Sequence, residues 1–330
     1  MRRIEFSEIR NIDDLAKCLS CTNEDLRRLA FDATSAKHCR KMLIPKKNKS
    51  GHRIVYKSFD KSLSLIQKNL ETTINHNEIF PECVQGFVRK GCIAKNAGKH
   101  LAKRYVLNAD IEDFFESIGM LQIVNAFKRI GCNDDIAIML SRLCTLDEQL
   151  VQGFSTSPVI SNLVCHGMDE DFVTLSKQYN CTYTRYADDM SFSGNAVPTQ
   201  GDIEDILSNH GFKLNKKKFF LQKRGDKQYV TGLTVFDDKY PRIPKRIKKK
   251  LRLTLYYADK YGLLNHFEKI GIDWSFVDWE INKIDGWIAF MFSVEPALAK
   301  NFKAKWNIIL DEHKKSMSSE SGAYNVFPEN

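Results

Sequence analysis

Residues Tyr186-Ala187-Asp188-Asp189 place two adjacent carboxylates between two short runs of β-branched, hydroxyl and aromatic residues, 181–186 and 190–193. Such runs on both sides of Ala-Asp-Asp predict a β-hairpin with the acids at its tip. Two like charges side by side repel, so burying them together is unfavourable unless cations neutralise them. Taken alone, an Asp-Asp pair would indicate only an ordinary acidic turn.

A second acidic position changes this interpretation. Residues 104–109 form a short, largely apolar predicted strand that ends at Asp110. A carboxylate at a strand end, together with a carboxylate hairpin, is what a two-metal phosphoryl-transfer site requires, with two Mg²⁺ ions about 3.5–4 Å apart. Oxygen-only ligands of this kind suit Mg²⁺. The spacing does not establish that Asp110 and Asp188 meet in space.

These motifs and several further segments resemble the conserved segments of reverse transcriptases. The Tyr-Ala-Asp-Asp hairpin and Asp-Ile-Glu-Asp-Phe-Phe at 110–115 resemble the palm motifs, and residues 53–56 resemble the first fingers motif. Residues 152–158 are similar to the Gln-Gly motif beside the nucleotide, and residues 211–218 are similar to the motif after the catalytic hairpin. Each segment is weak by itself, but the set is very specific.

Two shorter segments narrow the resemblance to retron reverse transcriptases. Residues 96–100 match the Asn-Ala-x-x-His signature of that group, and residues 230–232 match its Val-Thr-Gly signature. The signature residues are Asn96, Ala97, His100, Val230, Thr231 and Gly232. A single Asn and a single His in a polar stretch usually make structural hydrogen bonds, whereas the resemblance suggests a role tied to the retron RNA.

The resemblance implies an α+β right-hand polymerase fold with fingers, an antiparallel palm and a helical thumb. We expect a helical extension at 1–36, fingers and palm at 37–240, an RNA-binding thumb at 241–315 and a disordered tail at 316–330. No RNase H domain is expected. Periodicity predicts strands at 41–45, 52–56 and within 217–243. It predicts helices at 12–33 (two), 60–75, 119–130, 134–146, 157–178, 202–210 and from 244 to about 313.

By resemblance, Asp110 and Asp188 are the principal ligands of two Mg²⁺ ions, for which Mn²⁺ can substitute. Asp189 assists, and the backbone carbonyl of Ile111 adds a ligand. Asp113 is a further acid, which we expect to serve a helix N-terminus, where a carboxylate offsets the helix dipole.

Four residues are assigned to the incoming nucleotide by the same resemblance. Arg53 would grip the triphosphate with its guanidinium fork, while Gln152 and Gly153 would lie against the nucleotide, with Gly153 allowing close backbone approach. Phe115 aligns with the position below the sugar, where a bulky ring would exclude a 2′-hydroxyl and so select dNTPs. The alternative for Phe115 is a core aromatic.

A basic run at 244–252 is the clearest nucleic-acid-binding candidate. Ile247, Leu251 and Leu255 recur every four residues and would face a core, which leaves the charges on the other faces of the helix. We therefore assign nucleic-acid contacts to Lys245, Arg246, Lys248, Lys249, Lys250 and Arg252, together with Lys218. A solvated charged face is the ordinary explanation of such a run. Phosphate tracking, with affinity that falls steeply with salt, is the functional one.

The amino-acid composition limits the classes of protein to which this chain can belong. The 330 residues are 43% hydrophobic and carry a formal charge of +9, which suits a globular protein with a polyanionic partner. No apolar run approaches about eighteen residues, and the N-terminus has no apolar signal-peptide core. Nine scattered cysteines fit reduced thiols and a bacterial cytoplasmic location. Cys18 and Cys21 have zinc-ligand spacing, but an apolar helical stripe containing Leu15 and Leu19 explains this segment better.

The resemblance finally implies a reaction and its partners. A retron reverse transcriptase binds a cognate structured non-coding RNA, starts DNA synthesis from an internal guanosine 2′-hydroxyl and consumes dNTPs. Its product is branched, RNA-linked single-stranded DNA (msDNA), made in an anti-phage defence system with an accessory effector protein and host RNase H. No membrane is involved. The alternatives are a group II intron or diversity-generating reverse transcriptase, or a non-catalytic RNA-binding scaffold.

Overall fold

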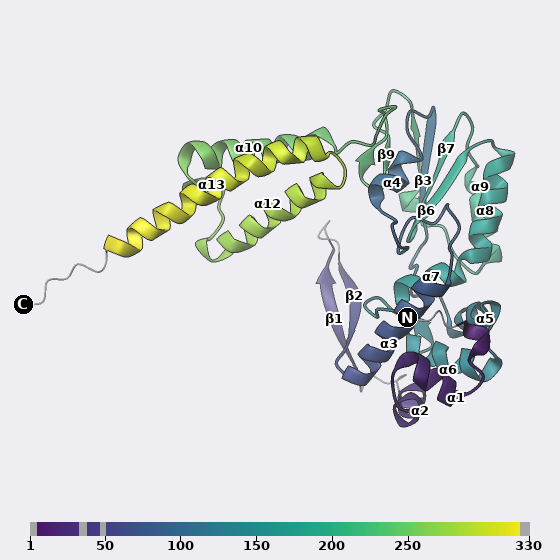
Figure 1. Cartoon of the computed structure of the whole chain (residues 1–330). Helices are drawn as coiled ribbons and strands as arrows, with labels where there is room; N and C mark the ends of the chain where they lie inside the picture. The colour runs from purple at the N-terminus through teal and green to yellow at the C-terminus, as the bar shows by residue number, and fades with distance from the viewer. Residues whose placement is uncertain (1–4, 33–37, 47–50, 324–330) are drawn as a thin grey trace, which may run out of the picture. The chain divides into compact units, whose positions relative to one another are not determined.

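The computed structural model describes residues 5–32, 38–46 and 51–323, and the chain divides into two units, Met1–Thr231 and Gly232–Asn330 (Figure 1). The second unit begins at Gly232 rather than at residue 241. The reason is that the backbone of Thr234 exchanges two hydrogen bonds with that of Arg242, which ties residues 232–241 to the helices that follow. Within the described residues, no helix combines the length and apolar character needed to cross a membrane.

The first unit starts with short helices that pack through apolar stripes. They are η1 (Phe6–Glu8), α1 (Ile12–Leu19) and α2 (Asn23–Asp32). The Thr22 hydroxyl accepts a hydrogen bond from the Asp25 N–H at the start of α2. Leu15 and Leu19 are fully buried, which confirms the apolar stripe. Strands β1 (Cys39–Pro45) and β2 (His52–Ser58) then pair antiparallel, and α3 (Lys61–Asn77) follows. Most of the connection between the strands predicted at 41–45 and 52–56, residues 47–50, lies outside the described residues.

A four-stranded antiparallel sheet forms the centre of the first unit. Its order is β6 (Thr182–Tyr186), β7 (Asp189–Gly194), β3 (Tyr105–Asp110) and β8 (Phe220–Lys223). Side chains alternate between the two faces of a strand. One face therefore carries apolar residues such as Leu107 and Phe192, which are buried in the main core, while the other carries polar residues such as Asn108 and Asp110. The predicted hairpin and mixed α+β class are confirmed.

Helices cover this sheet and extend the core. They are α4 (Ile93–Gly98), α5 (Met120–Arg129), α6 (Asp134–Cys144), α7 (Ser157–Val164), α8 (His166–Gln178) and α9 (Gln200–Asn209). The short hairpin of β4 (Thr145–Leu146) and β5 (Gln149–Leu150) joins α6 to the next segment. The single helix predicted at 157–178 is two helices, because Cys165, with ψ near 0°, interrupts the helical path. Figure 1 shows α8 and α9 beside the sheet, and the ring of Phe172 on α8 packs tilted against Tyr183 and edge-on against Phe192.

The second unit is helical after short extended segments. After η2 (Lys216–Lys218) and β9 (Tyr229–Val230) of the first unit come β10 (Leu233–Thr234), α10 (Lys245–Tyr261), α11 (Leu263–Lys269), η3 (Trp274–Phe276), α12 (Val277–Phe292) and α13 (Pro296–Ala323). The three long helices lie side by side (Figure 1). Helix α13 continues to Ala323, so the tail predicted to be disordered from residue 316 is helical as far as 323, because helix propagation is far easier than initiation.

Candidate active site

Three carboxylates from distant parts of the sequence meet at one end of the sheet. Asp110 is the last residue of β3 and lies opposite Asp189, the first residue of β7, in the antiparallel register. The N–H of Ile111 donates to the backbone carbonyl of Asp188 at 3.1 Å. These contacts place the strand-end acid beside the hairpin acids, which the spacing in the sequence did not establish.

Asp110 is the buried member of the group and has two cationic or polar partners. It is 2% exposed, and its Oδ2 accepts from Lys218 Nζ at 2.6 Å while its Oδ1 accepts from Asn215 Nδ2 at 2.9 Å. Burial disfavours the charged form of Lys218, but its contacts with the three acids outweigh this and raise its pKa. Lys218 therefore lies in the site, not on a separate nucleic-acid surface. The motif at 211–218 carries both partners, but sequence reasoning did not assign them to Asp110.

The other two acids are held close to like charges. Burial and then the neighbouring charge of Asp110 raise the pKa of Asp188. Burial of the carboxyl group, followed by the charges of Asp188 and Asp110, raises the pKa of Asp189 to about 6. The residue Asp189 is nevertheless exposed to solvent, so water screens part of this repulsion. The site has more negative charge than Lys218 neutralises.

This excess charge and the all-oxygen donor set fit a divalent cation. Hard cations such as Mg²⁺ bind carboxylate oxygens and complete their coordination with water and substrate phosphates. In the described residues, no three His, Cys, Asp or Glu side chains form a ready metal cage. A site with one or two carboxylates per ion and phosphate oxygens from a substrate does not need such a cage. Asp110, Asp188 and Asp189 are the residues that would hold the ions.

The nucleotide candidates of the Gln-Gly motif lie against strand β2. The N–H of Tyr56 donates to the carbonyl of Gln152 at 2.7 Å, and Gln152 Nε2 donates to Glu116 at 3.3 Å. Gly153 has φ +111°, and a Cβ there would lie 2.2 Å from the Tyr56 carbonyl oxygen. The approach of β2 therefore requires glycine at this position, and the predicted place of Gly153 against the nucleotide stays a prediction. Arg53 lies exposed on the same strand.

Phe115 and Asp113 occupy the turn that follows Asp110. Phe115 is half-buried and packs between the rings of Phe114 and Phe87, at centroid distances of 5.3 and 6.3 Å. Phe114 is buried in the core, whereas the ring of Phe115 is only partly buried. Asp113 has φ +44° within this turn, and the next helix begins only at Met120, so the expected helix N-terminal role of Asp113 is wrong. The reason is that residues 112–117 form turns, not a helix.

The two signature segments meet behind the polar face of the sheet. Asn96 Nδ2 donates to the Thr231 hydroxyl at 3.5 Å, and that hydroxyl donates to the Ile93 carbonyl at 3.3 Å. His100 is fully buried, and its ring nitrogens bond the hydroxyls of Ser193 and Thr184, both at 2.7 Å. Burial lowers the pKa of His100 to about 3, so the ring is neutral. These contacts favour the structural interpretation of the signature.

Two other members of the signature are also inside the fold. Ala97 and Val230 are both buried, within 1% exposure. Gly232 has φ +81°, a left-handed conformation that glycine adopts without strain. The side chains of Ala97 and Val230 therefore contribute to the local fold, whereas Gly232 is exposed.

The basic run lies on α10 as predicted. Leu251 and Leu255 are buried, while five of the six basic residues are exposed: Lys245, Arg246, Lys249, Lys250 and Arg252. Lys248 differs because its Nζ lies 3.1 Å from the carboxylate of buried Glu295, which also accepts from the Ile243 N–H. We therefore assign Lys248 to the internal packing of the second unit, which corrects its place among the nucleic-acid contacts.

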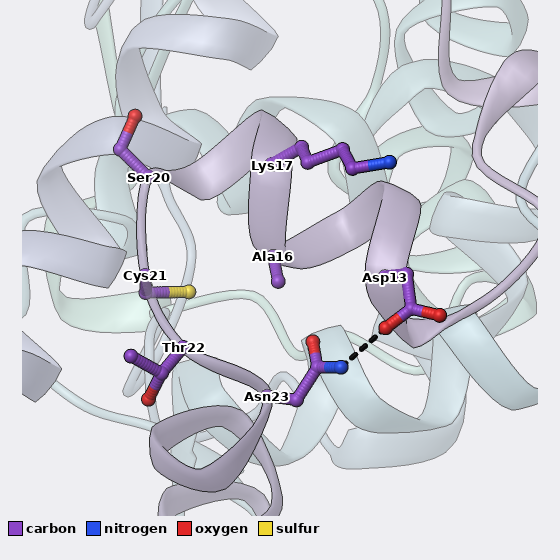
Figure 2. A pocket seen from close by; sticks show the side chains of 7 residues that line it. All are labelled: Asp13, Ala16, Lys17, Ser20, Cys21, Thr22 and Asn23. Carbon is purple, nitrogen blue, oxygen red and sulfur yellow. Dashed lines mark hydrogen bonds between the residues drawn. The ribbon is translucent and has the colours of Figure 1, made fainter.

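A hollow of about 610 Å³ lies between α1 and α2, away from the carboxylates (Figure 2). It is lined by Asp13, Ala16, Lys17, Ser20, Cys21, Thr22 and Asn23. Asn23 donates to Asp13 across it. Burial raises the pKa of Cys21 to about 11, so its thiol is protonated at neutral pH, and His38 pairs with Asp60 instead of facing the cysteines. The residues that line this hollow do not form a catalytic or metal-binding group.

Comparison with known proteins agrees with the motifs. Residues 44–234 match the family described as reverse transcriptase (RNA-dependent DNA polymerase). The retron Ec86 reverse transcriptase of Escherichia coli is 25% identical over 302 residues, which cover 89% of this chain and 88% of that protein. The retron Ec73 reverse transcriptase of Escherichia coli is 29% identical over 281 residues (79% and 84%). The retron Mx65 reverse transcriptase of Myxococcus xanthus is 28% identical over 250 residues (68% and 58%).

Proposed function

The chain belongs to the reverse transcriptase family and is an RNA-directed DNA polymerase of the retron type, and we propose on this basis that it makes msDNA. In this reaction a guanosine 2′-hydroxyl of a bound non-coding RNA attacks the α-phosphate of a dNTP and releases pyrophosphate. Further nucleotides then extend the DNA along the RNA template. The convergence of Asp110, Asp188 and Asp189 at one sheet end is the observation that carries the proposal.

We propose that Asp110, Asp188 and Asp189 hold two Mg²⁺ ions, with Mn²⁺ as a substitute. Reverse transcriptases depend on divalent metal ions, and bound Mg²⁺ would supply Lewis-acid activation of the attacking hydroxyl and charge neutralisation on the leaving pyrophosphate. Lys218 and Asn215 hydrogen-bond both oxygens of Asp110 and so fix the orientation of that carboxylate. The raised pKa of Asp189, caused by burial and by the charges of Asp188 and Asp110, supports a site that binds added positive charge.

The nucleotide would lie between the carboxylates and the segment around Gln152. Arg53 carries an exposed guanidinium on β2, the strand whose backbone is bonded to Gln152. A planar fork of this kind matches phosphate oxygens. Phe115 presents the open side of its ring and would exclude a ribose 2′-hydroxyl by contact.

The RNA would be gripped by the second unit, acting as the thumb. Five exposed basic residues project from α10, and phosphate contacts dominate the affinity of nucleic-acid-binding proteins. Tyr256 and Tyr257 follow on the same helix and are exposed. Tyr257 stacks with Tyr261 and His266, so unpaired bases would add to an existing aromatic cluster. The first unit would comprise the fingers and palm.

The proposal extends to the cellular location of the protein and to its partners. The chain would act in the bacterial cytoplasm, where its cysteines stay reduced, with host RNase H trimming the template and an effector protein completing a defence system. The alternatives, a group II intron or diversity-generating enzyme, lack support from the 96–100 and 230–232 signatures. A non-catalytic scaffold would have no chemical need for three converging carboxylates.

The experiment is purification from the native host, followed by sequencing and nuclease treatment of the bound nucleic acid. One short DNA joined to RNA and released by a debranching enzyme would support 2′-primed synthesis and reveal the template. Bound RNA without attached DNA would overturn the msDNA proposal. A primer-extension assay with Mg²⁺ would then separate a reverse transcriptase of another type from a scaffold.

A further inference from the structure

A fully buried arginine directly precedes the catalytic turn. Arg185 is 0% exposed, and its Nε and Nη2 donate to the two carboxylate oxygens of Asp169 on α8 at 2.8 and 2.7 Å. Its third nitrogen, Nη1, donates to Asn162 Oδ1 and to the backbone carbonyl of Ala187, both at 3.1 Å. All three nitrogens of the guanidinium are therefore in use, and one of them reaches the turn that carries Asp188.

Stability does not explain why a charge is buried here. Removing two ions from water costs several kcal/mol per ion, and replacing a buried ion pair with well-packed apolar residues is often neutral or stabilising. Asp169 and Arg185 satisfy each other, but an apolar pair of similar volume would fill the same space. What an apolar pair cannot supply is the hydrogen bond from Nη1 to Ala187.

Ala187 needs such support because its backbone is strained. It has φ +60°, a left-handed conformation that is unfavourable for a residue with a Cβ. Conformations of this kind persist only where the surroundings enforce them. If the turn relaxed, Asp188 and Asp189 would change direction, because they follow Ala187 without an intervening residue.

A second segment, residues 83–86, also contacts the Ala187 turn. Segment 83–86 runs beside β6, with the Arg185 N–H bonded to Cys83 and the Gln85 N–H bonded to Arg185, both at 2.8 Å. A Cβ on Gly86 would lie 2.5 Å from the Ala187 nitrogen, so this backbone touches the turn directly. Asn162 links the two sides, since its Nδ2 donates to the Gly86 carbonyl at 3.0 Å.

We propose that Arg185, supported by Asp169 and Asn162, is a positioning residue that fixes the Ala187 turn so that Asp188 and Asp189 face Asp110. The inference rests on the proposed function, because it concerns the same carboxylates. It assigns no contact with substrate to Arg185, whose side chain lies with Asp169 in the buried core beneath the sheet. It predicts that metal binding and the chemical step depend on a group that neither metal nor substrate touches.

The test compares Asp169→Leu/Arg185→Met with the wild type and with Tyr183→Phe. The double variant removes both buried charges together, so neither charge is left in the core without its partner. Tyr183→Phe is the matched control, since Tyr183 donates to Asp169 at 2.9 Å but makes no contact with Ala187. Mn²⁺ affinity is measured by electron paramagnetic resonance on RNA-free protein, and kcat and the dNTP KM are measured by single-nucleotide extension.

We expect the double variant to bind Mn²⁺ about tenfold more weakly, as when other outer contacts of metal ligands are removed. Its kcat should fall about 100-fold, with the dNTP KM nearly unchanged, because misplaced reacting groups slow the chemical step. Tyr183→Phe should match the wild type in all three measurements. Arg185→Lys keeps the charge but loses the guanidinium fork, and it should show the same losses of Mn²⁺ affinity and of kcat. It serves as the test if the double variant fails to fold.

A folded double variant or Arg185→Lys with wild-type Mn²⁺ affinity and kcat would overturn the proposal. So would an equal loss in Tyr183→Phe, which would reduce the network to core packing. A wild type that binds Mn²⁺ but incorporates no nucleotide would overturn the proposed function instead, while the Mn²⁺ comparison would still decide the role of Arg185.

Discussion

At the scale of single residues, the carboxyl group of Asp189 is unfavourable in its ionised form unless a cation is bound nearby. Its folded pKa of about 6 lies above the ordinary value of 3.8, so ionisation opposes folding. The metal-free wild type therefore gains stability as pH falls from about 6 toward 3.8.

We predict that Asp189→Asn stabilises the metal-free protein at pH 7. The gain should be at most about 1 kcal/mol, because the residue is exposed and water screens the repulsion. Thermal unfolding in chelator and in Mg²⁺ measures this, and Mg²⁺ should stabilise the wild type more than the variant. Lower stability of the variant in chelator would contradict the assignment of repulsion at this position.

His100 predicts a loss of stability in acid. The folded pKa is about 3 and the ordinary value is 6.5, so the unfolded chain binds a proton at pH values where the folded chain does not. Stability from neutral His100 is complete above about pH 6.5 and is lost as pH falls toward 3. Between pH 7 and 5 the loss should be about 2 kcal/mol of unfolding free energy.

The measurement is denaturant unfolding of the wild type and of His100→Gln at both pH values. Glutamine does not titrate but can still hydrogen-bond the hydroxyls of Ser193 and Thr184. The variant should lack this part of the pH dependence. Equal pH dependence in the two proteins would mean that His100 is protonated, or accessible, in the folded state.

At the scale of an element, helix α10 carries two kinds of basic residue: one that pairs with a buried carboxylate and several that are exposed to solvent. Lys248 pairs with buried Glu295, which Arg242 also contacts at 3.4 Å, so removing Lys248 would take away one of two cations beside a carboxylate inside the second unit. Lys245, Lys249 and Lys250 are exposed, so their replacement tests binding without disturbing the core.

We predict that Lys245→Ala/Lys249→Ala/Lys250→Ala weakens RNA binding and flattens its salt dependence. The slope of log affinity against log salt should fall by about one for each phosphate contact that is lost. Binding titrations at several salt concentrations measure the slope. Lys68→Ala/Lys128→Ala/Lys177→Ala, which removes the same charge from α3, α5 and α8, should leave it nearly unchanged. An equal effect of the two triple variants would make the α10 run an ordinary solvated face.

At the scale of the whole molecule, the acids and the basic helix lie in different units. The carboxylates belong to Met1–Thr231 and α10 belongs to Gly232–Asn330. Chemistry and RNA retention should therefore be separable by substitution.

We predict that Asp188→Asn/Asp189→Asn abolishes DNA synthesis while the protein still carries its RNA. Asparagine keeps the size of the side chains but removes the charge that would hold Mg²⁺. Primer extension and sequencing of co-purified RNA measure the two properties in the same preparation. dNTP incorporation at the wild-type rate would refute the assignment of these acids, and loss of the RNA would show that they also serve binding.

The sequence by itself determined the family, the mixed α+β class, the acid hairpin and most of the helices, because short-range periodicity and motif chemistry are written in neighbouring residues. Its errors were of another kind. Lys248 and Asp113 received roles from their own segments, whereas the contact of Lys248 with Glu295 and the turn at 112–117 that holds Asp113 follow from how the chain is arranged in space.

Only the tertiary structure decided which polar groups meet. The pairings of Asp110 with Lys218, of Asn96 with Thr231 and of Arg185 with Ala187 are contacts made in space, and two of them join residues more than a hundred positions apart in the chain. A buried charge or amide takes whichever partner the packing brings within about 3 Å. That partner is set by strand register and helix packing, which no local pattern records.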